Sequence, residues 1–220
     1  MFDLDQTLIK GFKGHKAAFS EAFRKVYGVD TSIDIINHAG MTEQQVITEV
    51  LKKNGLDEKI IKLKIKDCLR VMDESFNEII KRDEILVLGG VKELLEELDE
   101  HNILIGLVTG NTESIARNKL RKVGLDKYFK VGGFGNDDIN RVKLVKIAIQ
   151  RAIDNFAFKL NNNVFIFGDT PRDIKAGKEA GVKTVGVATG IYSEGQLKEA
   201  GADFVAINLK DKEKILEIIS

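Results

Sequence analysis

The chain has 220 residues, of which 43% are hydrophobic and 31% charged, the balance of a globular protein that buries a core. Basic and acidic residues both number 34, so the overall charge gives no reason to expect a nucleic acid or an anionic membrane as a partner. We find no apolar run near the roughly 18 residues of a membrane span, no export leader before the first motif, and a single cysteine, Cys68. We therefore expect a protein of the reducing cytoplasm.

Helical patterns follow the opening stretch MFDLDQTL. Residues 13–83 show helical periodicity and no comparable strand pattern, in GHKAAFSEAFRKVYG, MTEQQVITEVLKKNG and DEKIIKLKIKDCLRVMDESFNEIIKR. Thr42 and Gln45 form a plausible capping box for the second of these helices. The pattern predicts an all-helical domain over residues 13–83, inserted directly after the first strand.

Strands and helices alternate from about residue 85 onward. The intervening stretches have apolar residues at helical spacing, and KDKEKILEII predicts a closing helix. This alternation is typical of βαβ units, so we expect an α/β core over residues 1–12 and 84–220, with a Rossmann-like parallel sheet covered by helices on both faces. The predicted strands are 103–110, 130–134, 163–169, 183–190 and 202–207.

Polar residues gather where these predicted strands end. The carboxyl ends of parallel strands meet at one edge of a sheet, and ligands bind there. Four carboxylates, a hydroxyl and a cation at one edge are hard to explain as packing. The residues in question are Asp3, Asp5, Thr109, Gly110, Asn111, Asp169 and Asp173, with Arg141 and Lys143 at the start of the helix after GGFGNDDIN.

Carboxylates in such proximity repel one another unless a positive charge lies among them. A hard divalent cation with oxygen ligands satisfies this requirement, and Mg²⁺ suits one or two carboxylates together with water and phosphate. The ion would offset the repulsion between an anionic nucleophile and an anionic substrate. A lysine or arginine nearby would neutralise the remaining phosphoryl charge.

Four ordered motifs resemble those of the haloacid dehalogenase-like superfamily, in the group with a helical cap after the first motif, such as phosphoglycolate phosphatases. FDLDQTL is similar to the first motif, LVTGN to the second, a basic residue at 141 or 143 to the third, and GDTPRD to the fourth. The resemblance spans the whole chain in the family's order. It implies a phosphatase that acts on a small phosphorylated metabolite, a phosphoglycolate-like acid or a small sugar phosphate.

The resemblance also implies roles for individual residues. Asp3 would be the nucleophile that forms an aspartyl-phosphate, and Asp5 the general acid toward the leaving oxygen and later the base for water. Magnesium would be held by Asp3, the backbone carbonyl of Asp5 and Asp169, with Asp173 acting through water or orienting the ligands. The phosphoryl group would be bound by Thr109, with the backbone at Gly110 and Asn111.

The chain departs from the family pattern at two motifs. The position after the second acid is usually glycine but here is Gln6, which predicts a stiffer turn. The third motif is usually lysine followed by proline, and this sequence has no such pair. Arg141 and Lys143 both fit, and we favour Arg141 because it is closer to the start of the helix.

Several alternatives stay open. A phosphomutase acting on a sugar phosphate, or a non-catalytic protein that binds a phospho-ligand on the same scaffold, would share these motifs. The stretch from Asn37 to Thr42 fits either a loop that closes over the substrate or a plain helix start. His15, His38 and His101 match no metal spacing, so we expect surface or structural roles for them. The substrate and the oligomeric state are not indicated.

The first strand looks short. Only Met1 and Phe2 precede Asp3, whereas a buried strand usually has about 5–6 residues. We therefore expect the natural polypeptide to begin several residues upstream, with an apolar run before Phe2.

Overall fold

A parallel β-sheet forms the centre of the protein in a computed structural model that describes residues 1–11, 14–160 and 163–219. Strands pair in parallel as β3 with β4, and as β5 with β6 and β6 with β7. These strands are β3 (Gly106–Thr109), β4 (Val131–Phe134), β5 (Phe165–Gly168), β6 (Lys183–Val187) and β7 (Phe204–Ala206).

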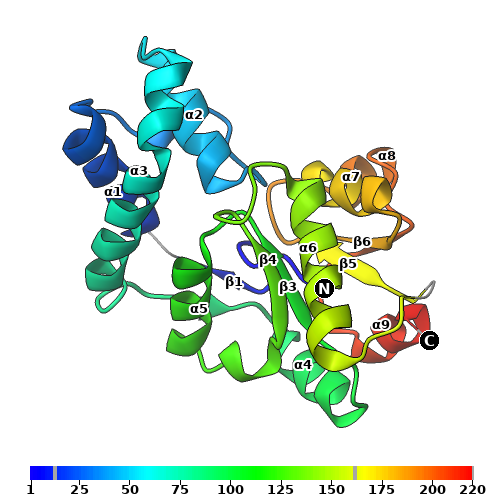
Figure 1. The fold of residues 1–220 in the computed structure, drawn as a ribbon. Coiled ribbons are helices and arrows are strands. Elements are labelled where there is room, and N and C mark those ends of the chain that lie inside the picture. Colours follow the sequence, from blue (N-terminus) through cyan, green and yellow to red (C-terminus); the bar gives the residue numbers. More distant parts are fainter. Residues whose placement is uncertain (12–13, 161–162, 220) are drawn as a thin grey trace.

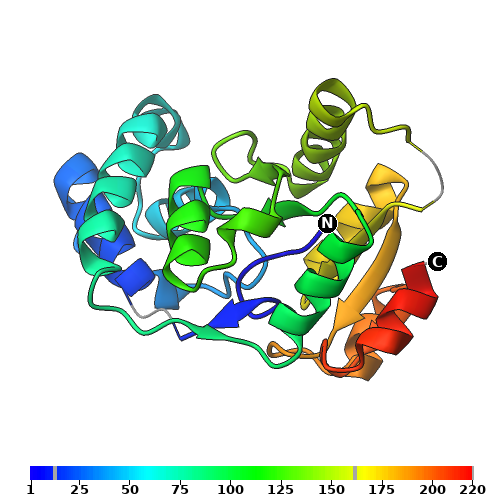
Figure 2. The ribbon, with the colours of Figure 1, turned by 90° about the horizontal axis from the view of Figure 1, so that it is seen from below.

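The amino-terminal segment joins the two groups of strands into one sheet. Phe2 pairs in parallel with Leu107 of β3 on one side and with Phe167 of β5 on the other. Its amide donates to the carbonyl of Gly106 at 2.9 Å, and the amide of Asp3 donates to the carbonyl of Phe167 at 2.8 Å. The chain start is therefore the central strand of the sheet, and Figure 2 shows it in blue between the green and the orange parts of the core. Asp3 follows this strand at the carboxyl edge.

An apolar cavity lies beside Met1. It has a volume of about 230 Å³ and is lined by residues of β3, β4 and β5, among them Gly106, Val131 and Phe165. The expectation of further residues upstream of Met1 stays a prediction.

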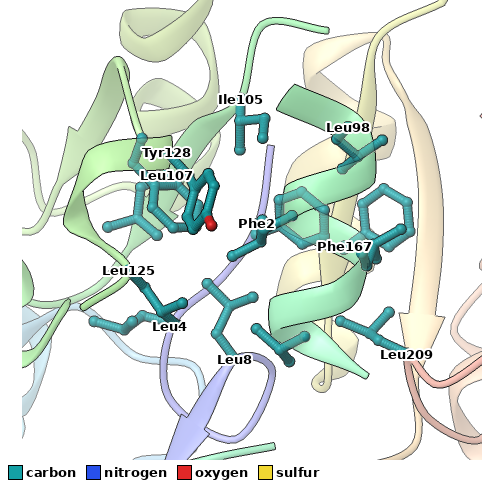
Figure 3. Close-up of a cluster of buried hydrophobic side chains, with 14 of the residues drawn as sticks. Phe2, Leu4, Leu8, Leu98, Ile105, Leu107, Leu125, Tyr128, Phe167 and Leu209 are labelled. Carbon is teal, nitrogen blue, oxygen red and sulfur yellow. The ribbon is translucent and has the colours of Figure 1, made fainter. Parts of the chain in front are cut away.

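Helices cover both faces of the sheet, as the sequence predicted. Successive residues of a strand point to opposite faces. In β5, Phe167 packs with α4 and α9, whereas Ile166 packs with α6 and α7. Figure 3 shows the first of these cores, with Phe2 and Phe167 at its centre; their rings stack with centroids 4.6 Å apart. The helices of this part are α4 (Val91–Glu100), α5 (Glu113–Lys122), α6 (Arg141–Phe156), α7 (Pro171–Ala180), α8 (Glu194–Glu199) and α9 (Lys212–Ile219).

A separate group of helices, which we call the helical cap, stands over the carboxyl edge of the sheet (Figure 1). It has its own buried core, which includes Phe23, Ile47, Met72 and Phe76. Cys68 is buried in this core. No helix in the described part of the chain is long and apolar enough to cross a membrane. The cap comprises α1 (Gly14–Ala22), the short turns η1 (Phe23–Tyr27) and η2 (Ile33–Ile35), α2 (Glu43–Lys53) and α3 (Glu58–Ile79).

The two connections between the cap and the sheet pair with each other, which the sequence did not predict. β1 (Ile9–Lys10) lies antiparallel to β2 (Leu86–Val87), with Ile9 opposite Val87. This two-stranded ribbon holds the two connections side by side at the base of the cap. The predicted boundary between residues 12 and 13 lies outside the described residues.

Candidate active site

Three strand ends bring the predicted polar residues to one edge. Asp3 follows the central strand, Thr109 ends β3 and Asp169 follows β5. All three side chains are buried, although they lie at the end of the sheet. The cap covers this edge, and a pocket of about 520 Å³ remains between the cap and the sheet.

A cluster of acids forms the floor of the pocket. Carboxylate oxygens of Asp3, Asp169 and Asp173 lie within 4.8 Å of one another. The guanidinium of Arg141 forms ion pairs with Asp3 and Asp173. Arg141 is the first residue of α6, after Asn140, whose side chain accepts a hydrogen bond from the amide of Val142 and so caps the helix.

Burial makes this cluster electrostatically costly. Desolvation raises the pKa of Asp3 well above its usual range, against the opposing effect of Arg141. Desolvation and the neighbouring Asp173 raise the pKa of Asp169 to about 7. Three buried carboxylates so close together favour the binding of a cation.

The donor set fits a magnesium ion. Buried carboxylate oxygens are the hard ligands that Mg²⁺ takes. Asp173 uses one oxygen, Oδ2, to accept the reciprocal capping bond from the amide of Thr170 at 3.0 Å. Its other oxygen, Oδ1, accepts no hydrogen bond from any described residue and turns toward Arg141, 2.5 Å away. The helix-capping function of Asp173 therefore leaves an oxygen for the acid cluster.

Asp5 lies apart from the three clustered acids. Its carboxylate accepts a hydrogen bond from Asn111 Nδ2 at 2.9 Å and pairs with Lys119 at 2.8 Å. Asn111 Nδ2 also donates to Thr109 Oγ1 at 2.9 Å, so the second motif is connected to Asp5. The sequence analysis missed Lys119, although a signal exists: it shares a helix face with the buried Ile115, Ala116 and Leu120.

The cap contributes Glu43 and His15 to the same region, and neither was singled out as a site residue. Glu43 Oε2 accepts from the amide of Thr112 at 2.7 Å, and Glu43 Oε1 lies 2.8 Å from His15 Nε2. Desolvation raises the pKa of Glu43 to about 8, and desolvation together with Lys119 lowers the pKa of His15 to about 3. Both side chains are therefore neutral at pH 7. His15 was expected to be a surface or structural residue, and the structure places it in the pocket wall.

The loop before α2 lies over the acid cluster. Residues 37–41 line the pocket, and Thr42 caps α2 through the predicted capping box with Gln45. Arg172 Nη1 donates to the carbonyl of Ala39 at 2.5 Å. This loop approaches the end of β3 so closely that a glycine is needed at position 110, because a β-carbon there would collide with the carbonyl of Met41. The helix start is therefore present at Thr42 and the residues before it line the pocket, whereas closure of this loop over a substrate stays a prediction.

The structure separates the two basic residues that the sequence left open. Arg141 is buried among the acids. Lys143 is 62% exposed and pairs with Asp138 at 2.9 Å, outside the pocket. The two residues lie on opposite faces of α6, so Arg141 faces the acid cluster and Lys143 faces solvent.

A parallel sheet with buried aspartates at its carboxyl edge, beneath a helical cap, defines a Rossmann-like core with a capped acidic site. The family model of haloacid dehalogenase-like hydrolases matches residues 1–187, and the chain belongs to this family. The family resemblance predicted from the motifs is therefore confirmed.

Two curated relatives and one solved structure illustrate the similarity. Pyrophosphatase PpaX of Listeria monocytogenes serotype 4b is 27% identical over 213 residues, covering 96% of this chain and 92% of its own. A phosphorylated carbohydrates phosphatase of Thermotoga maritima is 28% identical over 238 residues, covering 100% and 96%. The crystal structure of a predicted phosphoglycolate phosphatase from Haemophilus somnus has a TM-score of 0.70 at 20% identity, covering 98% and 96%, and shares the fold.

Proposed function

We propose that this protein is a magnesium-dependent phosphatase that transfers the phosphoryl group of a small phosphorylated metabolite to Asp3 and then to water. The observation that carries the proposal is the position of Asp3. Its carboxylate lies on the floor of the pocket, paired with Arg141 and within 4.8 Å of carboxylate oxygens of Asp169 and Asp173. Relatives along nearly the whole chain are a pyrophosphatase and a phosphatase of phosphorylated carbohydrates.

The chemistry consists of two displacements at phosphorus. In the first, an oxygen of Asp3 attacks phosphorus, the ester P–O bond breaks, and Asp5 gives its proton to the leaving oxygen. In the second, water attacks the same phosphorus while Asp5 takes its proton, and Asp3 is released with inorganic phosphate. Asp5 is suited to both steps because it lines the pocket without belonging to the acid cluster.

Arg141, Thr109 and the backbone at Gly110 and Asn111 would bind the phosphoryl oxygens, since they line the floor around Asp3. Magnesium would be held by Asp3, the backbone carbonyl of Asp5, Asp169 and Asp173. When bound, the ion would supply positive charge to the phosphoryl oxygens and offset the repulsion between substrate and nucleophile.

The pocket wall favours a substrate whose leaving group carries no charge. Phe19 and Val46 line the cap side with their apolar side chains, beside the neutral Glu43. Arg141 is the one arginine or lysine among the described residues that line the pocket, and the acids already engage it. A second anionic group would lose its hydration there without a partner. We therefore propose a sugar or polyol phosphate ahead of the phosphoglycolate-like acid that the sequence also suggested.

The test is hydrolysis of p-nitrophenyl phosphate with magnesium and with a chelator. We expect turnover with magnesium only, and the loss of at least about 10⁴-fold in kcat for Asp3→Asn, on the scale of removing a nucleophile. Wild-type protein quenched during turnover should carry one acid-stable, base-labile phosphoryl group on Asp3. Turnover by Asp3→Asn would refute the proposal. A phosphomutase would instead return the phosphoryl group to a sugar phosphate, and a non-catalytic binding protein would release no phosphate.

A further inference from the structure

Lys119 is a fully buried lysine behind Asp5. We call this part of the site, formed by Asp5, His15, Glu43 and Lys119, the leaving-group side. Its side chain is 0% exposed, and its ammonium lies 2.9 and 2.8 Å from the two carboxylate oxygens of Asp5. It also lies 2.8 Å from Asn111 Oδ1 and 3.4 Å from His15 Nδ1. An ammonium buried to this degree is stable only when its hydrogen-bonding capacity is met, so the lysine and its partners fix one another's positions.

These contacts determine the orientation of two polar groups. Contact with both oxygens of Asp5 holds its carboxylate in one rotamer. Because the ammonium can only donate, it must face the carbonyl oxygen of the Asn111 side chain. The amide nitrogen of Asn111 is thereby directed toward Asp5 and Thr109. A single cation thus aligns the proposed acid–base group and the amide beside the phosphoryl site.

We infer that Lys119 is a positioning residue for proton transfer, which holds Asp5 in line with the leaving oxygen and with the hydrolytic water. The inference rests on the proposed function, because it assigns Lys119 to the step that Asp5 performs. Lys119 keeps its own proton in both displacements. The proton moves only between Asp5 and the leaving oxygen, or between water and Asp5.

A positioning role predicts a dependence on the leaving group, which a role in folding alone does not. p-Nitrophenolate is a stable anion at neutral pH and leaves without a proton, whereas the alkoxide of 2-hydroxyethyl phosphate needs one. Lys119→Met keeps the length of the side chain and removes its charge. We expect the first displacement to slow by about 10²-fold or more with 2-hydroxyethyl phosphate, the scale of lost acid–base help. With p-nitrophenyl phosphate it should slow by less than tenfold.

The second displacement gives an independent signature. Water attack needs Asp5 as the base for either substrate, so it should slow in Lys119→Met. Rapid mixing with p-nitrophenyl phosphate should therefore show a burst of one equivalent of p-nitrophenol per protein, followed by slow turnover. The phosphoryl-enzyme should accumulate in the variant. A misfolded fraction would reduce the burst amplitude instead of producing a burst.

Three further variants complete the test. Lys122→Met changes an exposed lysine of the same helix and should leave both displacements unchanged. Lys119→Arg keeps the charge and should recover part of the rate with 2-hydroxyethyl phosphate. Asp5→Asn should reproduce the behaviour of Lys119→Met, and the double variant should be little slower than Asp5→Asn alone.

Two results would overturn the inference: equal losses with both substrates and no burst, or additive losses in the double variant. Failure of the proposed function itself would look different. In that case wild-type protein would not hydrolyse either ester, or Asp3→Asn would remain active.

Discussion

The phosphoryl side and the leaving-group side of the pocket compensate buried charge in different ways. On the phosphoryl side, which comprises Asp3, Asp169, Asp173 and Arg141, three carboxylates cluster and the one guanidinium pairs with two of them, Asp3 and Asp173. Desolvation and Asp173 raise the pKa of Asp169 to about 7. On the leaving-group side, Asp5 is matched by Lys119, and burial leaves Glu43 and His15 neutral at pH 7.

This difference indicates which kind of ligand each side of the pocket can bind. The phosphoryl side has three acids and one cation, so an added metal ion would balance its charge, as the proposed function requires. The leaving-group side is already balanced within the chain, so it gains nothing from a further charge. Under the proposed function, the same pocket would combine metal-dependent phosphoryl transfer with an uncharged leaving group.

The largest effect on this comparison should come from the cation of the phosphoryl side. Arg141→Ala should reduce kcat/KM by about 10²–10³-fold, because a positioned charge donor contributes about 3–4 kcal/mol to the transition state. Lys143→Ala is the matched control and should be nearly silent, since Lys143 contacts Asp138 outside the pocket. Steady-state kinetics on both variants would check this. Equal losses would mean that neither residue is the cation of the third motif.

The excess of acids on the phosphoryl side should also affect the free energy of unfolding of the protein without substrate. Asp169 binds a proton more tightly in the folded protein than in the unfolded chain, because desolvation and Asp173 raise its pKa from 3.8 to about 7. Its stabilising contribution is full below about pH 4 and is lost as the pH rises through about 7. The free energy of unfolding of the metal-free protein should therefore fall over this range.

Magnesium should reverse this trend, so the ion should raise the melting temperature more at pH 8 than at pH 5. Asp169→Asn should weaken both the pH dependence and the response to magnesium. Glu43, whose pKa is about 8, adds a trend in the same direction that magnesium should not remove. Urea unfolding at several pH values, with and without the ion, measures these contributions. An identical magnesium response in Asp169→Asn would exclude this residue as a ligand.

The charge balance of the leaving-group side predicts a moderate substrate preference. 2-Hydroxyethyl phosphate and phosphoglycolate differ by a hydroxymethyl group in place of a carboxylate. The uncharged ester should have the higher kcat/KM by about tenfold or more, about 1.4 kcal/mol. His38→Arg would add a cation to the pocket wall and should narrow the preference, whereas His38→Asn should not. A wild-type preference for phosphoglycolate would contradict this account of the pocket.

The smallest expected effect concerns the turn that directly follows Asp5. Gln6 adopts a left-handed conformation, with φ of 67°, where the family usually has glycine. Gln6→Gly should remove about 1–2 kcal/mol of strain and lose about 0.4–1 kcal/mol to the freer unfolded chain. We expect the free energy of unfolding to rise by between about 0 and 1.6 kcal/mol, measured by thermal unfolding. Gln6→Ala keeps the β-carbon and should not stabilise. A lower melting temperature for Gln6→Gly would show that the turn is not strained.

The sequence alone was sufficient for the sheet and its acidic edge. Alternating apolar runs and amphipathic stretches require a parallel sheet with helices on both faces. In such a sheet the residues after Phe2, Val108 and Gly168 must meet at one edge, whatever the details of packing. For this reason Asp3, Thr109 and Asp169 could be found from strand ends, and the capping box of Thr170 with Asp173 could be expected from Pro171 and its neighbours.

Only the tertiary structure decided which charges face one another across the pocket. Lys119 lies far from Asp5 in the sequence, and their contact depends on the rotation of α5 against the central strand. Glu43 reaches Thr112 only because α2 docks its first turn on the loop after β3. Arg141 and Lys143 differ by two positions, about 200° around a helix, so the phase of α6 sends one into the acid cluster and the other to solvent. The sequence indicates that Lys119 lies on the buried face of its helix, but the packing of the helices and the docking of the cap decide which groups it contacts there.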